Sequence, residues 1–304
     1  MSSKAIIIFP YGGYENNKQC EYFFWWTVDK CKEIDKKPII VINKDTLINN
    51  NAVSFMQDER SGTLEVIQTW AVDTCQMWLY GWGHVLDNHP EADRIIQIPG
   101  DIDYIYEENE FYDNLGQFIE ITDADIAIGD FKPGEEYDAK RLVDTYGTYA
   151  LLANWFPEIS KSIRAMALNR PRSEFINIRI SVLRELLKNN RKFAYEQTLN
   201  FIIKSWNFYS RQWKYDIAVF SLGTLSDDGS YRQYSGSIDQ IERTERILSL
   251  LWREIKEPLE KDISDKAIYD EQYKAFIDEY DKLYKKSKGI VESARTTIRA
   301  FLGV

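Results

Sequence analysis

Short apolar runs alternate with longer stretches of helical spacing through the first half of this sequence, and no other feature restricts its fold as much. The runs expected to form buried strands are residues 5–9, 38–43, 53–56, 94–98 and 126–128. Helices are expected at residues 20–34 and at residues 63–86, the second being apolar nearly all round. This alternation predicts an α/β fold, an open and mostly parallel sheet with helices on both faces.

The second half of the chain is more helical. Helices are expected at residues 138–155, 178–189, 195–205, 238–255 and 268–302. A strand is expected at residues 215–222, and a polar loop at residues 226–236 follows it. The last helix is amphipathic, and its apolar face is interpreted either as packing on its own domain or as the seam of a homodimer.

The composition limits both the partners and the location of the chain. Among 304 residues, 48 acidic and 38 basic side chains give a net charge of −10. This argues against a broad nucleic-acid surface, because phosphate binding needs clustered cations. No window approaches the roughly 20 apolar residues of a membrane span, and residues 5–9 are too short a run for a signal peptide. Because Cys20, Cys31 and Cys75 match no zinc or redox spacing, we expect a cytoplasmic protein with reduced, mostly buried thiols.

Ligands of such sheets bind beyond the carboxyl ends of the strands, and two aspartates follow one strand there. The run at residues 94–98 stops at Pro99 and Gly100, and Asp101 and Asp103 come next. Two carboxylates at this spacing are suited to one Mg²⁺ or Mn²⁺ ion that also holds a diphosphate. The alternative is a loop in which Asp101 caps a turn and Asp103 is solvated.

The turn after the first strand is a second candidate. It reads Phe9-Pro-Tyr-Gly-Gly-Tyr-Glu15, and its glycines let the backbone approach a ligand closely while the carboxylate accepts hydrogen bonds from a nucleobase. The turn has neither the third glycine of a dinucleotide-binding fingerprint nor the Gly-Lys pair of a P-loop. An ordinary strand-to-helix turn is the alternative.

Histidine chemistry is not expected. His84 and His89 are the two histidines of the chain, and both fall around the end of one expected helix. Their five-residue spacing does not match the one-face pattern of a helical zinc site. We interpret both as surface or capping residues.

Several of these segments together resemble one family. They are Phe9-Pro-Tyr11 with Glu15, Glu59-Arg60-Ser-Gly-Thr-Leu64, Gly100-Asp-Ile-Asp103, Arg170-Pro-Arg-Ser-Glu174 and Arg232-Gln-Tyr234-Ser-Gly-Ser-Ile-Asp239. Their order is similar to that in mannosylglycerate synthases and the related glucosyl-3-phosphoglycerate synthases, which are GT-A glycosyltransferases. The stretch at residues 124–157 also looks like the family's region after its metal motif, so that the resemblance covers residues 5–255.

The resemblance implies a role for each matching residue. The residues implied in nucleotide binding are Pro10, Tyr11, Gly12, Glu15, Asp58, Arg60 and Asp101. Asp101 and Asp103 would hold the divalent cation, and Arg232 and Tyr234 would close over the diphosphate from a mobile loop. Arg172, Ser173 and Glu174 would lie on the acceptor side, and Glu196 would supply a catalytic carboxylate.

The implied protein is a GT-A domain at residues 1–237 with a helical extension at residues 238–304. Residues 1–130 would form its nucleotide-binding half and residues 131–237 its acceptor-side half. Its implied activity is transfer of a sugar, from GDP-mannose or another nucleotide hexose, to a small polar acceptor, with retention of configuration and with Mn²⁺ or Mg²⁺.

The sequence departs from the family's pattern in three places. Tyr231 stands where the family has a histidine metal ligand, and a neutral phenol is a poor ligand for these cations. No lysine follows Gly62-Thr-Leu64, and the family's aspartate-rich segment is replaced by the stretch around Glu196. These departures keep open a glycosyltransferase-like protein that binds nucleotide or a partner without turnover. A sugar nucleotidyltransferase is a second alternative, although residues 9–15 lack the basic side chains that such enzymes place there.

Overall fold

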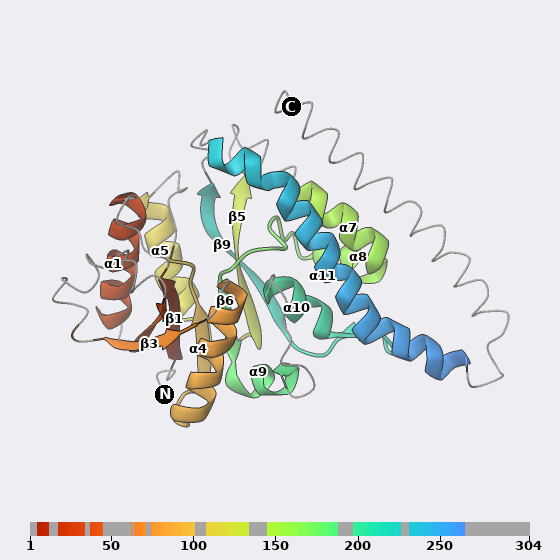
Figure 1. Ribbon diagram of the computed structural model, residues 1–304, viewed down its shortest axis with the longest axis horizontal. Coiled ribbons are helices and arrows are strands. Elements are labelled where there is room, and N and C mark those ends of the chain that lie inside the picture. The colour runs from red at the N-terminus through yellow and green to blue at the C-terminus, as the bar shows by residue number, and fades with distance from the viewer. Residues whose placement is uncertain are drawn as a thin grey trace. The chain divides into compact units, whose positions relative to one another are not determined.

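A computed structural model describes residues 5–11, 18–33, 37–44, 62, 64–70, 74–100, 108–133, 145–187, 197–225 and 231–264 (Figure 1). The chain divides into two compact units. The first comprises Met1–Lys132, Ser173–Asn207 and Gln212–Ser226, and the second comprises Pro133–Arg172, Phe208–Arg211 and Asp227–Val304.

A seven-stranded sheet forms the centre of the first unit. Its strands in spatial order are β3 (Glu65–Thr69), β2 (Lys37–Asn43), β1 (Ala5–Tyr11), β4 (Arg94–Gln97), β6 (Ile176–Arg179), β5 (Ile126–Pro133) and β9 (Ile217–Leu225). The pairs β2–β3, β1–β2 and β1–β4 are parallel, whereas β6 is antiparallel to both of its neighbours. The strand-and-helix alternation of the sequence therefore gives the expected α/β fold with one reversed strand inside the sheet.

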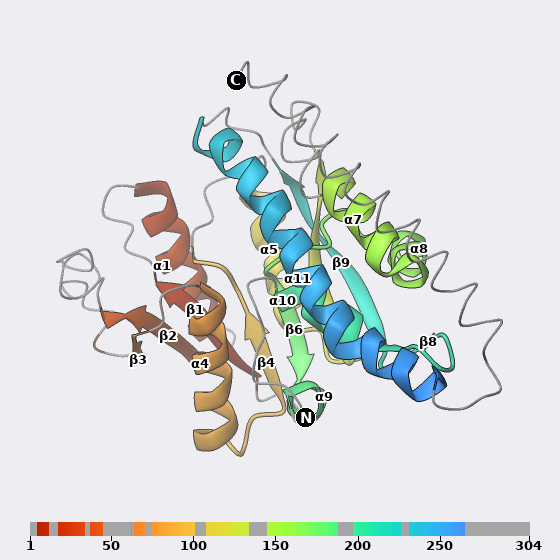
Figure 2. The same ribbon diagram turned by 45° about the vertical axis from the view of Figure 1, so that its right-hand side comes forward.

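Helices cover the sheet in two groups. On one side, α1 (Lys18–Glu33) and α5 (Glu108–Ile119) lie together through the stacked rings of Trp26 and Tyr112. Another pair, α4 (Thr74–Asn88) and α10 (Gln197–Lys204), meets where Trp82 packs on Phe201. In Figure 2, α4 lies over the parallel strands β1 to β4. Right-handed crossovers place α1 and α4 on opposite faces of the sheet.

Apolar side chains from both layers make the core of this unit. The largest of its fully buried side chains are Trp78, Trp82, Phe23, Phe24, Phe111, Phe118, Phe131 and Phe175. The short helix α9 (Ile180–Leu187) and the hairpin of β7 (Trp206–Asn207) and β8 (Gln212–Trp213) complete the described part of the unit. Cys31 is fully buried as expected, and burial raises the pKa of its thiol.

A buried polar network joins the strands near the amino end of β4. The Arg94 side chain donates from Nε to Asn177 Oδ1 at 2.6 Å, and Asn177 donates from Nδ2 to the carbonyls of Phe118 and Ile121. Burial, and then the neighbouring Arg179, lower the pKa of Arg94 to about 10. The guanidinium therefore stays charged at neutral pH, and Asn177 is the residue that satisfies it inside the sheet.

The second unit is helical over the residues that the structure describes. It contains α7 (Thr148–Trp155), α8 (Pro157–Ala165) and the 34-residue α11 (Tyr231–Ser264). Trp155 packs on Trp252, and Lys256 of α11 forms an ion pair with Glu158 of α8 at 2.8 Å. None of the described helices combines the length and the apolar character that crossing a membrane requires.

Several expected elements differ from those found. The helix expected at residues 63–86 is wrong in its first part, since residues 65–69 form β3 and α4 begins at Thr74. Strand β3 is half-buried and rich in β-branched residues, which favour strands. The helix expected from residue 178 begins at Ile180 instead, because Ile176–Arg179 pair with β4 and β5. The strand expected at residues 53–56 and the helix at residues 268–302 lie outside the described residues, so that the dimer seam stays a prediction.

Candidate functional site

The adjacent strands β1 and β4 mark the place where the strand order of the sheet reverses. From β1 the strand order runs through β2 to β3 on one side, and β4 pairs with β1 on the other side. Ile8 of β1 pairs with Gln97, the last residue of β4, and β1 continues for three more residues to Tyr11, so that both chains leave toward the same carboxyl side of the sheet. The strand order reverses between them, and ligands of such sheets bind outside the carboxyl ends at this reversal.

Both segments singled out in the sequence leave the sheet at this point. Pro10 and Tyr11 are the last residues of β1. Pro99 and Gly100, which are buried, follow β4 and lead directly to Asp101. The other residues expected to bind nucleotide, metal or substrate here lie outside the described residues: Gly12, Glu15, Asp58, Arg60, Asp101, Asp103 and Glu196. Their roles stay predictions.

Gln97, which the sequence analysis did not single out, links the carboxyl end of β4 to the expected acceptor segment. Its side chain is 1% exposed, and its Nε2 donates to the carbonyl of Glu174 at 2.9 Å. The Gln97 Oε1 atom is buried and has no hydrogen-bond partner among the described residues. A polar side chain held at the carboxyl end of a buried strand thus positions a segment that lies 77 residues further along the chain.

Ser173 is buried, and hydrogen bonds hold both its side chain and its backbone. Its hydroxyl donates to the carbonyl of Gly129 and accepts from the backbone N–H of Phe175. The carbonyl of Ser173 in turn accepts from the hydroxyl of Thr198, in the first turn of α10. These bonds bring residues 173–174 beside the beginning of α10, which Glu196 directly precedes. The acceptor role expected of Arg172, Ser173 and Glu174 stays a prediction.

The expected diphosphate-closing loop is shorter than the sequence suggested. Residues 226–236 were expected to be a loop, but α11 begins at Tyr231, so that Arg232 and Tyr234 lie in its first turns. A helix that starts here holds these two residues on one continuous element. Their side chains lie outside the described part of the structure, and their contact with a diphosphate stays a prediction.

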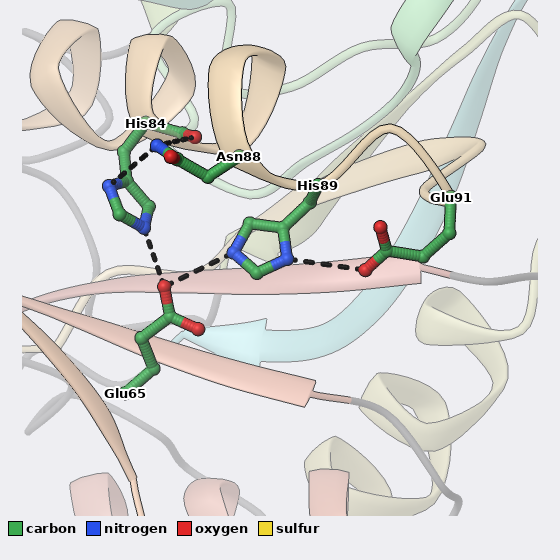
Figure 3. Close-up of polar contacts among 5 residues, drawn as sticks. All are labelled: Glu65, His84, Asn88, His89 and Glu91. Carbon is green, nitrogen blue, oxygen red and sulfur yellow. Dashed lines mark hydrogen bonds and ion pairs between the residues drawn. The ribbon is translucent and has the colours of Figure 1, made fainter.

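The two histidines form a cluster with a carboxylate, which corrects their interpretation as surface or capping residues (Figure 3). Glu65 opens β3, His84 lies in the last turns of α4, and His89 follows that helix. The Glu65 Oε1 atom lies 2.5 Å from His84 Nε2 and 3.1 Å from His89 Nε2. The His89 side chain is 8% exposed, so it is part of the interior. Because His89 lies beyond the end of α4, the helical spacing rule does not apply to the pair.

Comparisons with known proteins identify the fold. The sequence matches no protein-family model, and no curated protein is detectably similar to it in sequence. Among solved structures, glucosyl-3-phosphoglycerate synthase from Mycobacterium tuberculosis with Mn²⁺, UDP and glucosyl-3-phosphoglycerate has a TM-score of 0.51 and 14% identity. The alignment covers 83% of this chain and 79% of that one.

Two further structures of the same enzyme, with other ligands, are similar to this chain to the same degree. The complex with Mn²⁺, UDP-glucose and glycerol 3-phosphate gives a TM-score of 0.51 at 14% identity, over 83% of this chain and 79% of that one. The complex with phosphoglyceric acid gives 0.50 at 15% identity, over 82% and 78%. The sheet order, its reversal between β1 and β4 and these superpositions lead to one conclusion: the chain has the fold of the GT-A glycosyltransferases.

Proposed function

We propose that this protein is a glycosyltransferase that moves a sugar from a nucleoside diphosphate donor to a small polar acceptor with the help of a divalent cation. The observation that carries the proposal is the pairing of β1 with β4. It brings the carboxyl ends of β1 and β4 together in a GT-A sheet, and ligands of such sheets bind outside adjacent carboxyl ends where the strand order reverses.

The cation would be held by Asp101 and Asp103. Carboxylate oxygens are the ligands that Mn²⁺ and Mg²⁺ prefer, and both residues follow β4 after a buried Pro-Gly stop. The chemistry that a bound cation supplies is neutralisation of the charge that develops on the departing diphosphate. Glu15 is proposed to accept hydrogen bonds from the base, and Arg232 to contact the diphosphate oxygens.

The acceptor is proposed to bind beside residues 172–174. Gln97 holds this segment to β4 through the Glu174 carbonyl, and Thr198 holds it to α10 through the Ser173 carbonyl. These hydrogen bonds tie the proposed acceptor segment to the carboxyl end of β4, beside the proposed donor site. Such fixed positioning of two reactants is a large part of catalysis in a group-transfer enzyme.

The finer assignment of the donor rests on the family resemblance and on the titles of the similar structures. The resemblance favours GDP-mannose or another nucleotide hexose and a retaining outcome. Glucosyl-3-phosphoglycerate synthase was solved with UDP, UDP-glucose and Mn²⁺. We therefore propose a nucleotide hexose as the donor, with the guanine and uracil forms as the two to compare first.

The second candidate is a GT-A protein that binds the nucleotide without transferring a sugar. Tyr231, which stands in place of the family's histidine ligand, favours it, because a phenol binds Mn²⁺ and Mg²⁺ poorly. This candidate keeps nucleotide binding and loses turnover. The sugar nucleotidyltransferase alternative would instead release pyrophosphate from a nucleoside triphosphate and a sugar phosphate.

Thermal unfolding with GDP, UDP, GDP-mannose and UDP-glucose, with and without Mn²⁺, tests the proposal, since a ligand that binds the folded state raises its stability. We expect a cation-dependent shift with one base, followed by release of the nucleoside diphosphate when 3-phosphoglycerate or glycerate is added. Binding without release would support the non-catalytic candidate. No shift with any nucleotide would contradict both, and pyrophosphate release would support the nucleotidyltransferase.

A further inference from the structure

A second polar cluster lies at the first residue of β3, the strand at the end of the sheet order, and is separate from the proposed donor site at β1 and β4. Glu65 is the first residue of β3, and His84 and His89 come from the end of α4 and the turn after it (Figure 3). One ligand atom from each of the three residues lies within 4.8 Å of the other two. Glu65 pairs with Ile39 of β2, and strands β2 and β1 lie between β3 and β4, from which the predicted cation ligands Asp101 and Asp103 follow.

The His89 ring lies between two carboxylates, and one of the two contacts needs a proton or a cation in addition to the hydrogen of the neutral ring. Its Nδ1 lies 3.2 Å from Glu91 Oε1, and its Nε2 lies 3.1 Å from Glu65 Oε1. When Nδ1 donates its hydrogen to Glu91, the lone pair of Nε2 faces an oxygen of Glu65. Two lone pairs at this distance repel one another unless a cation or a proton lies between them. An imidazole backed by a carboxylate is also the usual arrangement of a metal-ligating histidine.

His84 completes the set from the other side of Glu65. Its Nε2 lies 2.5 Å from the same Oε1 atom. Asn88, one helical turn further on, donates from Nδ2 to the His84 carbonyl at 3.0 Å and lies 3.3 Å from Nδ1. With this donor beside it, Nδ1 accepts and Nε2 carries the ring hydrogen. Asn88 is exposed, so its amide can turn away from Nδ1, which then carries the hydrogen in its place. His84 can therefore present the lone pair of Nε2 to a metal.

We infer that Glu65, His84 and His89 form a zinc site, independent of the cation at Asp101 and Asp103. Two imidazole nitrogens and one carboxylate oxygen are a common zinc donor set, with water in the fourth position. Mg²⁺ and Ca²⁺ prefer oxygen ligands alone and do not suit two histidines. The side chains of His84 and Glu65 are each 24% exposed, which gives the ion a path from solvent, whereas that of His89 is 8% exposed.

The zinc acts as a clip between β3 and α4. It joins Glu65 to residues that lie 19 and 24 positions further along the chain, across the whole strand–helix unit. Among the described strands, β3 is at the end of the sheet order and pairs with β2. A metal bond at its first residue holds this strand to the helix that covers it. Glu91 orients His89 and stays outside the metal's own ligand set.

The test begins with the wild-type chain, freed of metal by a chelator and titrated with Zn²⁺. Since the chain has two histidines, an NMR spectrum of protein labelled in its histidine rings reports each ligand separately. We expect both rings to shift together at one equivalent of Zn²⁺, the midpoint of thermal unfolding to rise, and equal additions of Mg²⁺ to move neither ring. Absence of zinc binding, or binding that leaves either ring unmoved, would overturn the site.

Variants then assign the ligands, and far-UV circular dichroism checks that each one folds. The double variant H84A/H89A is expected to weaken zinc binding by at least about 100-fold, and Glu91→Gln by about 10- to 100-fold through the orientation of His89. Asp87→Asn, at an exposed carboxylate of α4, is the matched control and should bind zinc as the wild type does. Asp103→Ala should also keep the zinc affinity. Retention of tight binding by H84A/H89A, or its loss in Asp103→Ala, would contradict the assignment.

Discussion

Two parts of the central sheet differ in how well the sequence predicts the polar residues that they bring together. At the carboxyl edge, the predicted residues follow strands within a few positions, as Asp101 and Asp103 follow β4. At the first residue of β3, Glu65 contacts histidines 19 and 24 residues away, and no local pattern marks the cluster. Local motifs therefore reveal groups that one turn of chain presents together, whereas groups brought together by packing become visible in the structure alone.

The largest predicted effect concerns the buried network near the amino end of β4. Asn177→Ala removes the acceptor of a buried guanidinium and the donor of two carbonyls. The bond from Arg94 Nη2 to the Asn177 backbone carbonyl stays. We expect a loss of about 3–5 kcal/mol in the free energy of unfolding, because one hydrogen bond to a charged group and two bonds to backbone carbonyls are lost together. Denaturation in urea measures it.

The matched control for that change is Asn154→Ala, which removes one hydrogen bond to the Ala150 carbonyl within α7. It is expected to cost about 1 kcal/mol. If Asn177→Ala cost no more than Asn154→Ala, the network would not be what holds β4 and β6 together.

The carboxyl edge is tested by Asp103→Ala. A catalytic cation supplies several kcal/mol of transition-state stabilisation, so that loss of one of two ligands should lower Mn²⁺-dependent transfer by at least about 100-fold, or about 2.7 kcal/mol. The midpoint of thermal unfolding without ligands should not change. Asp113→Asn, on the exposed side of α5, is the control and should transfer normally. Unchanged transfer activity in Asp103→Ala would contradict the proposal that Asp103 holds the catalytic cation.

Much of the fold followed from the sequence, because continuous apolar runs marked the buried parallel strands. Strands β1, β2 and β4 match their expected runs to within one or two residues. Strand β3 was missed because its polar and β-branched residues continue into the apolar residues of α4, and the combined window resembles one helix. Periodicity alone does not separate two short elements that share a window.

The site was less predictable because its supports depend on distant pairing. Gln97 reads as one more residue of an apolar strand, and its bond to Glu174 depends on the antiparallel pairing of β4 and β6. No local pattern indicated that the Ser173 hydroxyl donates to the Gly129 carbonyl and accepts from the Phe175 N–H. A hydrogen bond across 77 residues leaves no local signal in the chain.

Arg232 tests whether the start of α11 contacts a nucleotide sugar or a partner. A charge-assisted contact with the diphosphate is worth about 1.5–3 kcal/mol, so Arg232→Ala should weaken nucleotide-sugar binding by about 10- to 150-fold in a calorimetric titration. Tyr231→His, on the preceding residue, should strengthen binding in the presence of Mn²⁺ because an imidazole replaces a poor ligand. Affinities unchanged in both variants would favour a surface for a partner at the start of α11.

The smallest predicted effect comes from two glycines with opposite outcomes. A Cβ at Gly129 would lie 2.5 Å from Leu222 Cδ1 and 2.6 Å from Phe175 Cβ. The leucine end can rotate, but Phe175 Cβ is fixed to the backbone next to Glu174. Gly129→Ala should therefore cost about 1–3 kcal/mol of stability. It should also raise the KM for the acceptor while donor affinity stays the same, since the displaced strand leads to the proposed acceptor segment.

In α5, a Cβ at Gly116 meets nothing within 4 Å, so that Gly116→Ala should stabilise the protein by about 0.5–1 kcal/mol. Equal effects of the two substitutions would show that the carboxyl edge tolerates movement, and that the close packing around Ser173 does not set the position of the acceptor.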